Sequence, residues 1–325
     1  MRFHCKKCKF PVKPASGMKL LDAACPKCEH PLKLTAADRM FGKYEMLEVL
    51  GSGGFGTVFK VQESGNDSLF TLKLIRRADV SKAEQVHLIR QIHSSRRMDH
   101  ANVVAAHDFG QEDDYWYLIS DYVEGLPLND WVKKISPDAR KSLLLCAHIG
   151  DALQHVHDKQ FIHRDLKPGN IIVDGQEQPH IIDFGLCTSE QDGDLMTIER
   201  YRAAREAIKK DKSRQKKFTL GTPGYAAPEQ LVGDPFSAKP TSDIYSLGVI
   251  LYELLTGQRP AKGLSSIFNA STLSAQLKRG DFDSGSAKKL TELCLSACAK
   301  NTSRRPPSAS AFATACRSVL DSQAS

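Results

Sequence analysis

The chain has 325 residues, of which 41% are hydrophobic and 26% are charged. These values are typical of a folded globular protein and exclude collagen-like, disordered and coiled-coil chains. The length allows one large core with a smaller appendage. The formal net charge of +7 points to polyanions, nucleic acid or a membrane surface, because excess Lys and Arg attract them.

No stretch reaches the roughly 18 consecutive apolar residues that a membrane span requires. The basic N-terminal residues are not followed by an apolar segment, so no secretory signal is predicted. Nine cysteines are an odd number, which favours reduced thiols and metal ligands over a secreted disulfide framework. We therefore expect a cytoplasmic protein.

Two cysteine pairs stand near the N-terminus. Cys5 and Cys8 form one CxxC motif, and Cys25 and Cys28 form another after sixteen residues. This spacing is typical of a zinc site in which two tight turns present four thiolates to one ion. So short a segment buries too little apolar surface to fold alone, so metal binding would supply most of its folding free energy. We expect a module at residues 1–36 that resembles a zinc ribbon and holds structural Zn²⁺.

Two roles are open for this module. Phe3, Phe10 and several lysines would let it stack on bases and contact phosphates, as nucleic-acid-binding modules do. Aromatic residues are few, however, which favours a structural module or one that docks a protein partner. Residues 37–43 are predicted to be a linker.

The pattern changes along the rest of the chain, from residue 44 to about 320. Short alternating segments and one helix near Ser81–Arg97 come first, which indicates a small β-rich lobe over 44–120. A mostly helical part follows, which indicates a larger lobe over 124–320. It contains a helix capped by Ser136 with Pro137 at its first position. The fold class is therefore α+β with two lobes. The strands are expected at Tyr44–Leu50, Thr57–Val61, Phe70–Ile75, Val104–Gly110 and Tyr115–Ser120, and a buried helix at Ser242–Gly257.

A glycine-rich segment with the pattern G-x-G-x-x-G-x-V lies between the first two expected strands, from Gly51 to Val58. A dinucleotide site of the Rossmann type would need a helix directly after the glycines. Thr57–Val61 is instead β-branched and alternating, so we predict a hairpin. Glycines there let backbone N–H groups approach phosphate oxygens.

Further motifs follow in order. Lys73 ends a strand, His163–Asn170 reads HRDLKPGN, Asp183–Gly185 reads DFG and Ala227–Glu229 reads APE. With the glycine-rich segment, these motifs resemble the eukaryotic-type (Hanks-type) protein kinases over residues 44–320. The resemblance implies the bilobal kinase fold, ATP and Mg²⁺ as cofactors and protein substrates, and the attached ribbon favours a bacterial source.

The resemblance also implies roles for single residues. Asp165 would accept the proton of the substrate hydroxyl, Lys167 would contact the γ-phosphate, and Lys73 would hold the α- and β-phosphates. Asn170 and Asp183 would bind Mg²⁺. Nucleotide-binding positions are Leu50, Gly51, Ser52, Gly53, Gly54, Phe55, Gly56, Val58, Lys73, Asp121 and Val123.

Two loops indicate the acceptor. Lys167-Pro168 in the catalytic loop and Gly221–Tyr225 resemble the Ser/Thr branch of the family, so we expect Ser/Thr phosphorylation in signalling, with autophosphorylation. Thr219 is a candidate phosphosite; an unmodified loop residue is an equal alternative. Ser120 falls at the gatekeeper position. Fold-supporting roles are implied for Asp243 as a buried carboxylate and for Arg305 as the partner of Glu229.

One departure keeps a second hypothesis open. The family's glutamate that pairs with the strand lysine falls on Gln91, which cannot neutralise Lys73, and Glu84 lies two helical turns earlier. A pseudokinase that binds ATP and acts as a scaffold is the alternative.

The positive charge is concentrated in two places. Residues 1–40 and an insertion at 199–217 each carry nine basic and three acidic side chains, which leaves the remainder at −5. The insertion is either a solvated loop or an element that recruits acidic substrates or shields the site.

Overall fold

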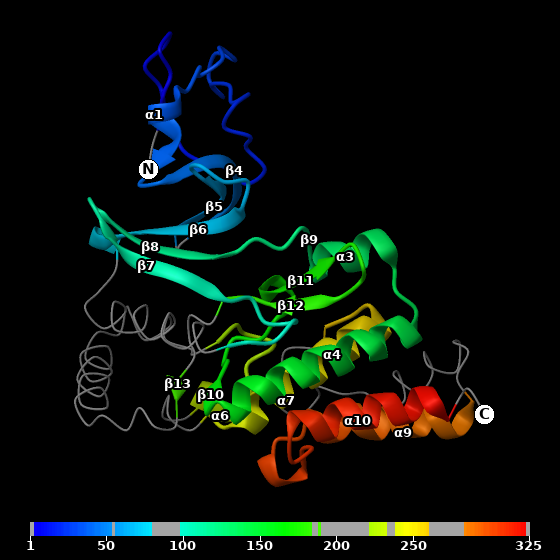
Figure 1. Ribbon diagram of the computed structural model, residues 1–325. Coiled ribbons are helices and arrows are strands. Elements are labelled where there is room, and N and C mark those ends of the chain that lie inside the picture. The colour runs from blue at the N-terminus through cyan, green and yellow to red at the C-terminus, as the bar shows by residue number, and fades with distance from the viewer. Residues whose placement is uncertain are drawn as a thin grey trace. The chain divides into compact units, whose positions relative to one another are not determined.

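The computed structural model describes residues 3–53, 56–79, 98–183, 188–189, 221–232, 238–259 and 283–322 (Figure 1). Some positions for which the sequence made predictions lie outside the described residues: Gly54, Phe55, Gln91, Thr219 and the insertion at 199–217. The chain divides into two compact units. One comprises residues 1–85 and 105–122, and the other comprises residues 86–104 and 123–325.

The smaller unit is built around a six-stranded antiparallel sheet with strand order β3-β4-β5-β6-β8-β7. Every strand expected from the alternating pattern is present, but β7 is displaced by two residues, and β6 continues to Arg76 instead of ending at Lys73. Side chains on the buried face come from alternate positions, among them Phe59, Val61, Leu72 and Ile119, as a half-buried sheet requires. The strands are β3 (Met40–Phe41), β4 (Tyr44–Gly53), β5 (Gly56–Glu63), β6 (Leu69–Arg76), β7 (Ala106–Glu112) and β8 (Tyr115–Asp121).

The N-terminal residues belong to the same unit. A small hairpin pairs β1 (Phe3–His4) with β2 (Pro11–Val12). Residues 37–43, expected to be a linker, contain most of helix α1 (Ala36–Arg39) and all of β3, which pairs with β4. Phe3, one of the two aromatic residues considered for base stacking, is buried in the core of this unit.

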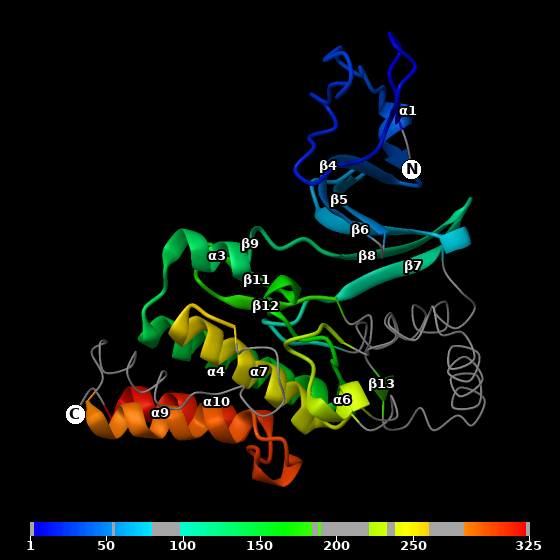
Figure 2. The same cartoon turned by 180° about the vertical axis from the view of Figure 1, so that it is seen from behind.

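The larger unit is mainly helical, and its core lies between α4, α7, α9 and α10 (Figure 2). A three-stranded sheet with strand order β12-β11-β9 and a two-stranded sheet of β10 and β13 complete it. None of the described helices is both long and apolar enough to cross a bilayer. The helices are α3 (Leu128–Ile135), α4 (Ala139–Asp158), α6 (Pro228–Val232), α7 (Pro240–Thr256), α9 (Ser284–Ala297) and α10 (Ala309–Asp321), and the strands are β9 (Gly125–Pro127), β10 (Phe161–Ile162), β11 (Ile171–Asp174), β12 (Pro179–Ile181) and β13 (Thr188–Ser189).

The ends of two helices test the capping predictions. Helix α7 is followed by Gly257 with a φ of 68°, so the expected glycine stop is confirmed. The expected start of α4 was wrong by two residues. Asp138, not Ser136, is the N-cap and accepts a hydrogen bond from the backbone of Lys141. Ser136 instead ends α3 in the left-handed region, with a φ of 48°.

Candidate active site and metal centre

The loop that carries Asp165 is held in place by a buried carboxylate on α7. The fully buried Asp243 accepts hydrogen bonds from the backbone N–H groups of His163 and Arg164, both at 2.8 Å. Nε2 of His157 lies 2.8 Å from the same carboxylate. The expected burial of Asp243 is confirmed, and its contacts fix the backbone just before Asp165.

The charge of Asp243 is stabilised by these partners. Burial alone would raise the pKa of the carboxyl group, but the hydrogen bonds from His157 and from the backbone of Arg164 outweigh it and hold the pKa below its usual range. Asp243 is therefore an ionised anchor inside the core. Its role is to position the loop.

Three side chains form a closed polar cluster at the catalytic loop. The ammonium of Lys167 donates to Oδ2 of Asp165 at 2.8 Å and to the hydroxyl of Thr222 at 2.9 Å. The Thr222 hydroxyl in turn donates to Oδ1 of Asp165 at 2.7 Å. Both carboxylate oxygens are therefore oriented, and a cation lies beside a potential general base.

Asn170 and Asp183, the two expected magnesium ligands, are brought together by their backbones. The side-chain nitrogen Nδ2 of Asn170 donates to the backbone carbonyl oxygen of Asp165 at 2.8 Å. The carbonyl oxygen of Asn170 accepts from the backbone N–H of Ile182 at 2.9 Å, the residue before Asp183. Asp183 itself is exposed and has a φ of 60°. One carboxylate and one amide oxygen in neighbouring positions suit a hard cation such as Mg²⁺.

The segment that delivers Thr222 to this cluster is anchored on the catalytic loop. Gly221 has a φ of +92°, and a Cβ there would lie 3.0 Å from the carbonyl oxygen of Arg164. The same carbonyl accepts a buried hydrogen bond from Gln230 at 2.8 Å. Glycine is required at this close approach, so the position of Thr222 depends on it.

Glu229, the last residue of the APE motif, forms the ion pair that the sequence predicted. Both nitrogens of the Arg305 fork bind the two Glu229 oxygens, at 2.6 and 2.8 Å. Burial raises the pKa of the Glu229 carboxyl, but the bonds from Arg305 and Ser242 outweigh it and leave the pKa below its usual range. The pair ties α6 to the segment before α10.

The smaller unit carries the residues that are expected to bind the phosphates of the nucleotide. Gly51 is paired with Val58, Val58 with Lys73, and Lys73 with Leu118. Directly opposed residues in adjacent strands point to the same face, so Val58 and Lys73 share one face of the sheet. The glycine-rich segment is a hairpin between β4 and β5, as predicted, with Ser52 opposite Thr57.

Close approach explains one glycine of this hairpin. Gly56 has a φ of +110°, and a Cβ would lie 2.3 Å from the carbonyl oxygen of Leu74. No other residue fits without moving the strand. The last glycine of the motif is thus set by the sheet, and Leu50, Ser52 and Gly53 lie on β4 just before the turn.

The expected adenine side of the site holds a polar pair that the sequence did not predict. Thr71 and Ser120 face each other across β6 and β8, and their hydroxyl oxygens lie 2.5 Å apart. Ser120 is the expected gatekeeper residue, but only the strand register places it opposite Thr71. The backbone N–H of Asp121 donates to the carbonyl oxygen of Ala105 at 3.1 Å, and Val123 follows β8.

The four N-terminal cysteines lie close enough together to hold one metal ion. Their sulfur atoms all lie within 4.8 Å of one another, and three of the contacts measure 3.5 to 3.7 Å. A tetrahedral Zn²⁺ with bonds of about 2.3 Å requires sulfur separations of about 3.8 Å. The donor set therefore fits a structural zinc ion, as expected from the sequence.

Two equivalent turns present these thiols. In the first, the backbone N–H of Cys5 donates to Phe10 and that of Lys9 donates back to Cys5, at 3.0 and 2.9 Å. In the second, the same bonds join Cys25 to His30 and Glu29 to Cys25.

The thiols of the cluster differ in acidity. The backbone N–H of Cys8 lowers the pKa of Cys5 to about 6. At Cys28 the backbone of His30 also lowers the pKa, but burial and the neighbouring sulfurs outweigh it and raise the pKa to about 12. The Cys5 thiol is thus more readily ionised than that of Cys28, and metal binding would release the remaining protons.

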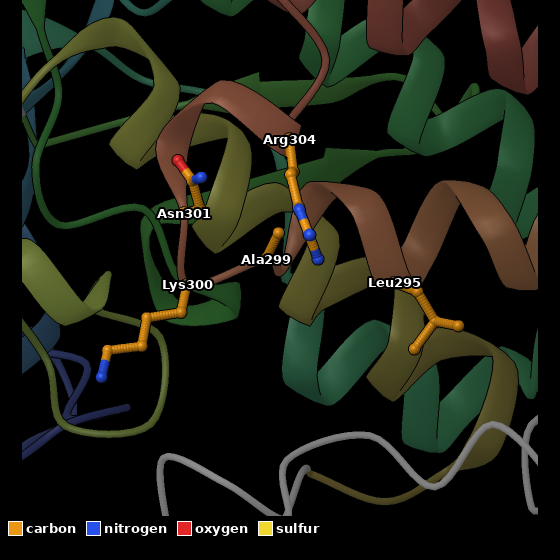
Figure 3. A pocket seen from close by; sticks show the side chains of 5 residues that line it. All are labelled: Leu295, Ala299, Lys300, Asn301 and Arg304. Atoms are coloured by element: carbon orange, nitrogen blue, oxygen red, sulfur yellow. The ribbon is translucent and has the colours of Figure 1, made fainter.

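A hollow of 630 Å³ lies elsewhere on the larger unit (Figure 3). It is formed where α9 ends and the short helix at Thr302–Arg304 begins. None of its lining residues belongs to the loop around Asp165 or to the pair expected to bind Mg²⁺, so it is separate from the candidate active site. The lining is Leu295, Ala299, Lys300, Asn301 and Arg304.

Comparison with known proteins agrees with this geometry. Residues 44–316 match the model of the protein kinase domain family. The chain belongs to the protein kinase family. The match begins where β4 begins and covers the glycine-rich hairpin, Lys73 and the Asp165 cluster.

Several bacterial kinases are similar to this kinase domain. They include serine/threonine-protein kinase PrkC of Bacillus subtilis, 31% identical over 77% of this chain and 35% of PrkC. Pkn3 of Myxococcus xanthus is 31% identical over 83% of this chain and 48% of its own length. PknA of Mycobacterium tuberculosis is 30% identical over 68% and 48%. The chain thus spans about a third to a half of these relatives.

Proposed function

We propose that the protein is an ATP-dependent kinase that transfers the γ-phosphate to Ser and Thr hydroxyls of protein substrates, with autophosphorylation, in a signalling role. The observation that carries this proposal is the Asp165–Lys167–Thr222 cluster, in which a carboxylate is oriented at both oxygens. Phosphoryl transfer needs positioning and charge stabilisation rather than covalent help from the protein. The cluster supplies both.

Asp165 is the group that handles the proton. The incoming hydroxyl donates a hydrogen bond to the Asp165 carboxylate, which orients the hydroxyl oxygen towards the γ-phosphorus. The carboxylate takes the proton as the new P–O bond forms, the bond from the γ-phosphorus to the β-phosphate oxygen breaks, and ADP leaves. Lys167, bonded to the same carboxylate, offers positive charge to the transferred phosphoryl group. Asn170 and Asp183 would hold Mg²⁺, which would neutralise part of the phosphate charge when bound.

The nucleotide is assigned to the residues on the β4–β5 hairpin and β6. Backbone N–H groups of the hairpin bind phosphate oxygens, and Lys73 contacts the α- and β-phosphates. The backbone at Asp121 and Val123 holds the adenine.

Thr222 supports the choice of acceptor. Its hydroxyl joins Lys167 to Asp165, and the relatives compared above are named serine/threonine-protein kinases. A structural role for Zn²⁺ in the four-cysteine cluster completes the cofactor set.

The test is phosphate incorporation by the full chain incubated with ATP and Mg²⁺, followed by mass spectrometry. We expect phosphoserine and phosphothreonine on the wild type and none on Asp165→Asn, with both proteins binding the nucleotide. Equal phosphate incorporation by the two proteins, above background, would contradict the proposal. Binding without transfer in both would instead support the scaffold alternative suggested by Gln91, and Gln91→Glu would then show whether the missing charge is the cause.

A further inference from the structure

The four-cysteine module is hydrogen-bonded to the strand that leads into the glycine-rich hairpin. Residues 16–20, between the two cysteine pairs, run antiparallel to β4, with Lys19 opposite Glu48. The backbone N–H of Val49 donates to Met18 at 2.9 Å, and that of Leu20 donates to Leu47 at 2.9 Å. The module is thus joined to β4 by backbone hydrogen bonds around an isolated β-bridge.

The contact continues up to the start of the hairpin. The backbone N–H of Gly17 donates to the carbonyl oxygen of Val49 at 2.7 Å. The Ser16 hydroxyl donates to the carbonyl oxygen of Leu50 at 2.9 Å, one residue before Gly51. These bonds restrain the chain at the point where it enters the proposed phosphate-binding turn.

Side chains of the four-cysteine module and of β4 belong to one hydrophobic core. Cys5, Cys25 and Leu20 are buried in the same apolar cluster as Met46 and Val49 of β4. Leu20 and Met46 are fully buried. Because two of the four thiols lie in this cluster, the order of the metal centre and the order of β4 depend on each other.

We propose that metal occupancy of the four-cysteine module controls the affinity of the nucleotide site. A bound metal would do so by holding β4 and the glycine-rich hairpin in the conformation that binds nucleotide. This inference rests on the proposed ATP-dependent function. Loss of the metal would lower the population of the binding-competent hairpin, and apparent affinity falls in proportion to that population.

The first experiment uses the full chain in zinc-loaded, zinc-stripped and zinc-restored forms, with the chelator removed by desalting. We expect stripping to raise the dissociation constant for ATP with Mg²⁺ about tenfold and Zn²⁺ to restore it. Hydrogen exchange at the Val49 amide, which is bonded across the contact, should accelerate on stripping and slow again on restoration. Unchanged affinity and unchanged Val49 exchange would overturn the proposal.

A glycine pair gives a matched variant that keeps all four thiols. Gly17 and Gly65 have φ values of +77° and +90°, and a Cβ at either meets nothing within 4 Å. Alanine therefore strains the backbone at both positions without a clash, but only Gly17 lies at the contact. With zinc content equal, Gly17→Ala should raise the ATP dissociation constant about threefold and speed Val49 exchange, and Gly65→Ala should change neither. Equal effects of the two variants would contradict a specific role for the contact.

The two proposals fail in different ways. A zinc-loaded wild type that binds no ATP would contradict the proposed function and the link to affinity, while exchange at Val49 would still decide whether the metal orders β4. A wild type that binds ATP equally with and without zinc would contradict only the link.

Discussion

At the scale of single residues, the hydrogen bonds of the Thr222 hydroxyl to Lys167 and Asp165 were not predicted from the sequence. The motifs identify Asp165, Lys167 and Asn170 because their order and spacing are fixed within one loop. Thr222 is 57 residues from Asp165. Nothing local in the sequence predicts that the Thr222 hydroxyl bridges the side chains of Asp165 and Lys167. The Thr71–Ser120 pair escaped prediction for the same reason.

Removing this hydroxyl gives a residue-level prediction. Thr222→Val should lower kcat about 10- to 100-fold, because a hydrogen bond to a charged group contributes about 1.5–3 kcal/mol. Thr222→Ser, which keeps the hydroxyl, should retain most of the activity. The dissociation constant for ATP should be unchanged in both variants. A Val variant as active as the Ser variant would show that the hydroxyl does not orient Asp165 for transfer.

At the scale of elements, the sequence predicted the strands better than the contacts between them. Alternation located β4, β5, β6 and β8 because each has one buried face. The pairing of residues 16–20 with β4 has no such signal, since it consists of backbone bonds from a segment without regular alternation. The start of α4 was misplaced because Ser136, a good N-cap by type, is used to end α3.

The ion pair between α6 and the segment before α10 predicts a pH dependence. Because the folded pKa of Glu229 is lowered, the folded protein binds this proton more weakly than the unfolded chain does. The contribution of the pair is therefore fully present above the unfolded pKa of about 4.3 and is lost as the pH falls below it, through the folded pKa.

Glu229→Gln tests this contribution. At pH 7 it should lower the free energy of unfolding by about 3–5 kcal/mol, because it leaves the buried Arg305 charge without its partner. In urea unfolding, the loss relative to wild type should shrink as the pH falls below about 4.3. Glu292→Gln, on the exposed face of α9, is the control and should change stability little. A pH-independent difference would contradict the assignment.

At the scale of the whole molecule, the net charge alone does not show where the charge is located. The net charge of +7 points to polyanions, yet the basic excess is confined to residues 1–40 and 199–217, and the remainder is acidic. The order of the motifs predicted the protein kinase family, which the family comparison confirms, and it supplied the candidate catalytic side chains. The inclusion of the N-terminal module in the smaller unit depends on a shared core that only three-dimensional packing reveals.

The central claim is that this chain phosphorylates Ser and Thr through Asp165. The most direct measurement is transfer from γ-labelled ATP with Mg²⁺ to three matched peptides that differ only in a single Ser, Thr or Tyr acceptor. We predict label on the Ser and Thr peptides, none on the Tyr peptide, and none on any peptide with Asp165→Asn. No transfer by the wild type, preferential labelling of Tyr, or equal labelling by Asp165→Asn would contradict the claim.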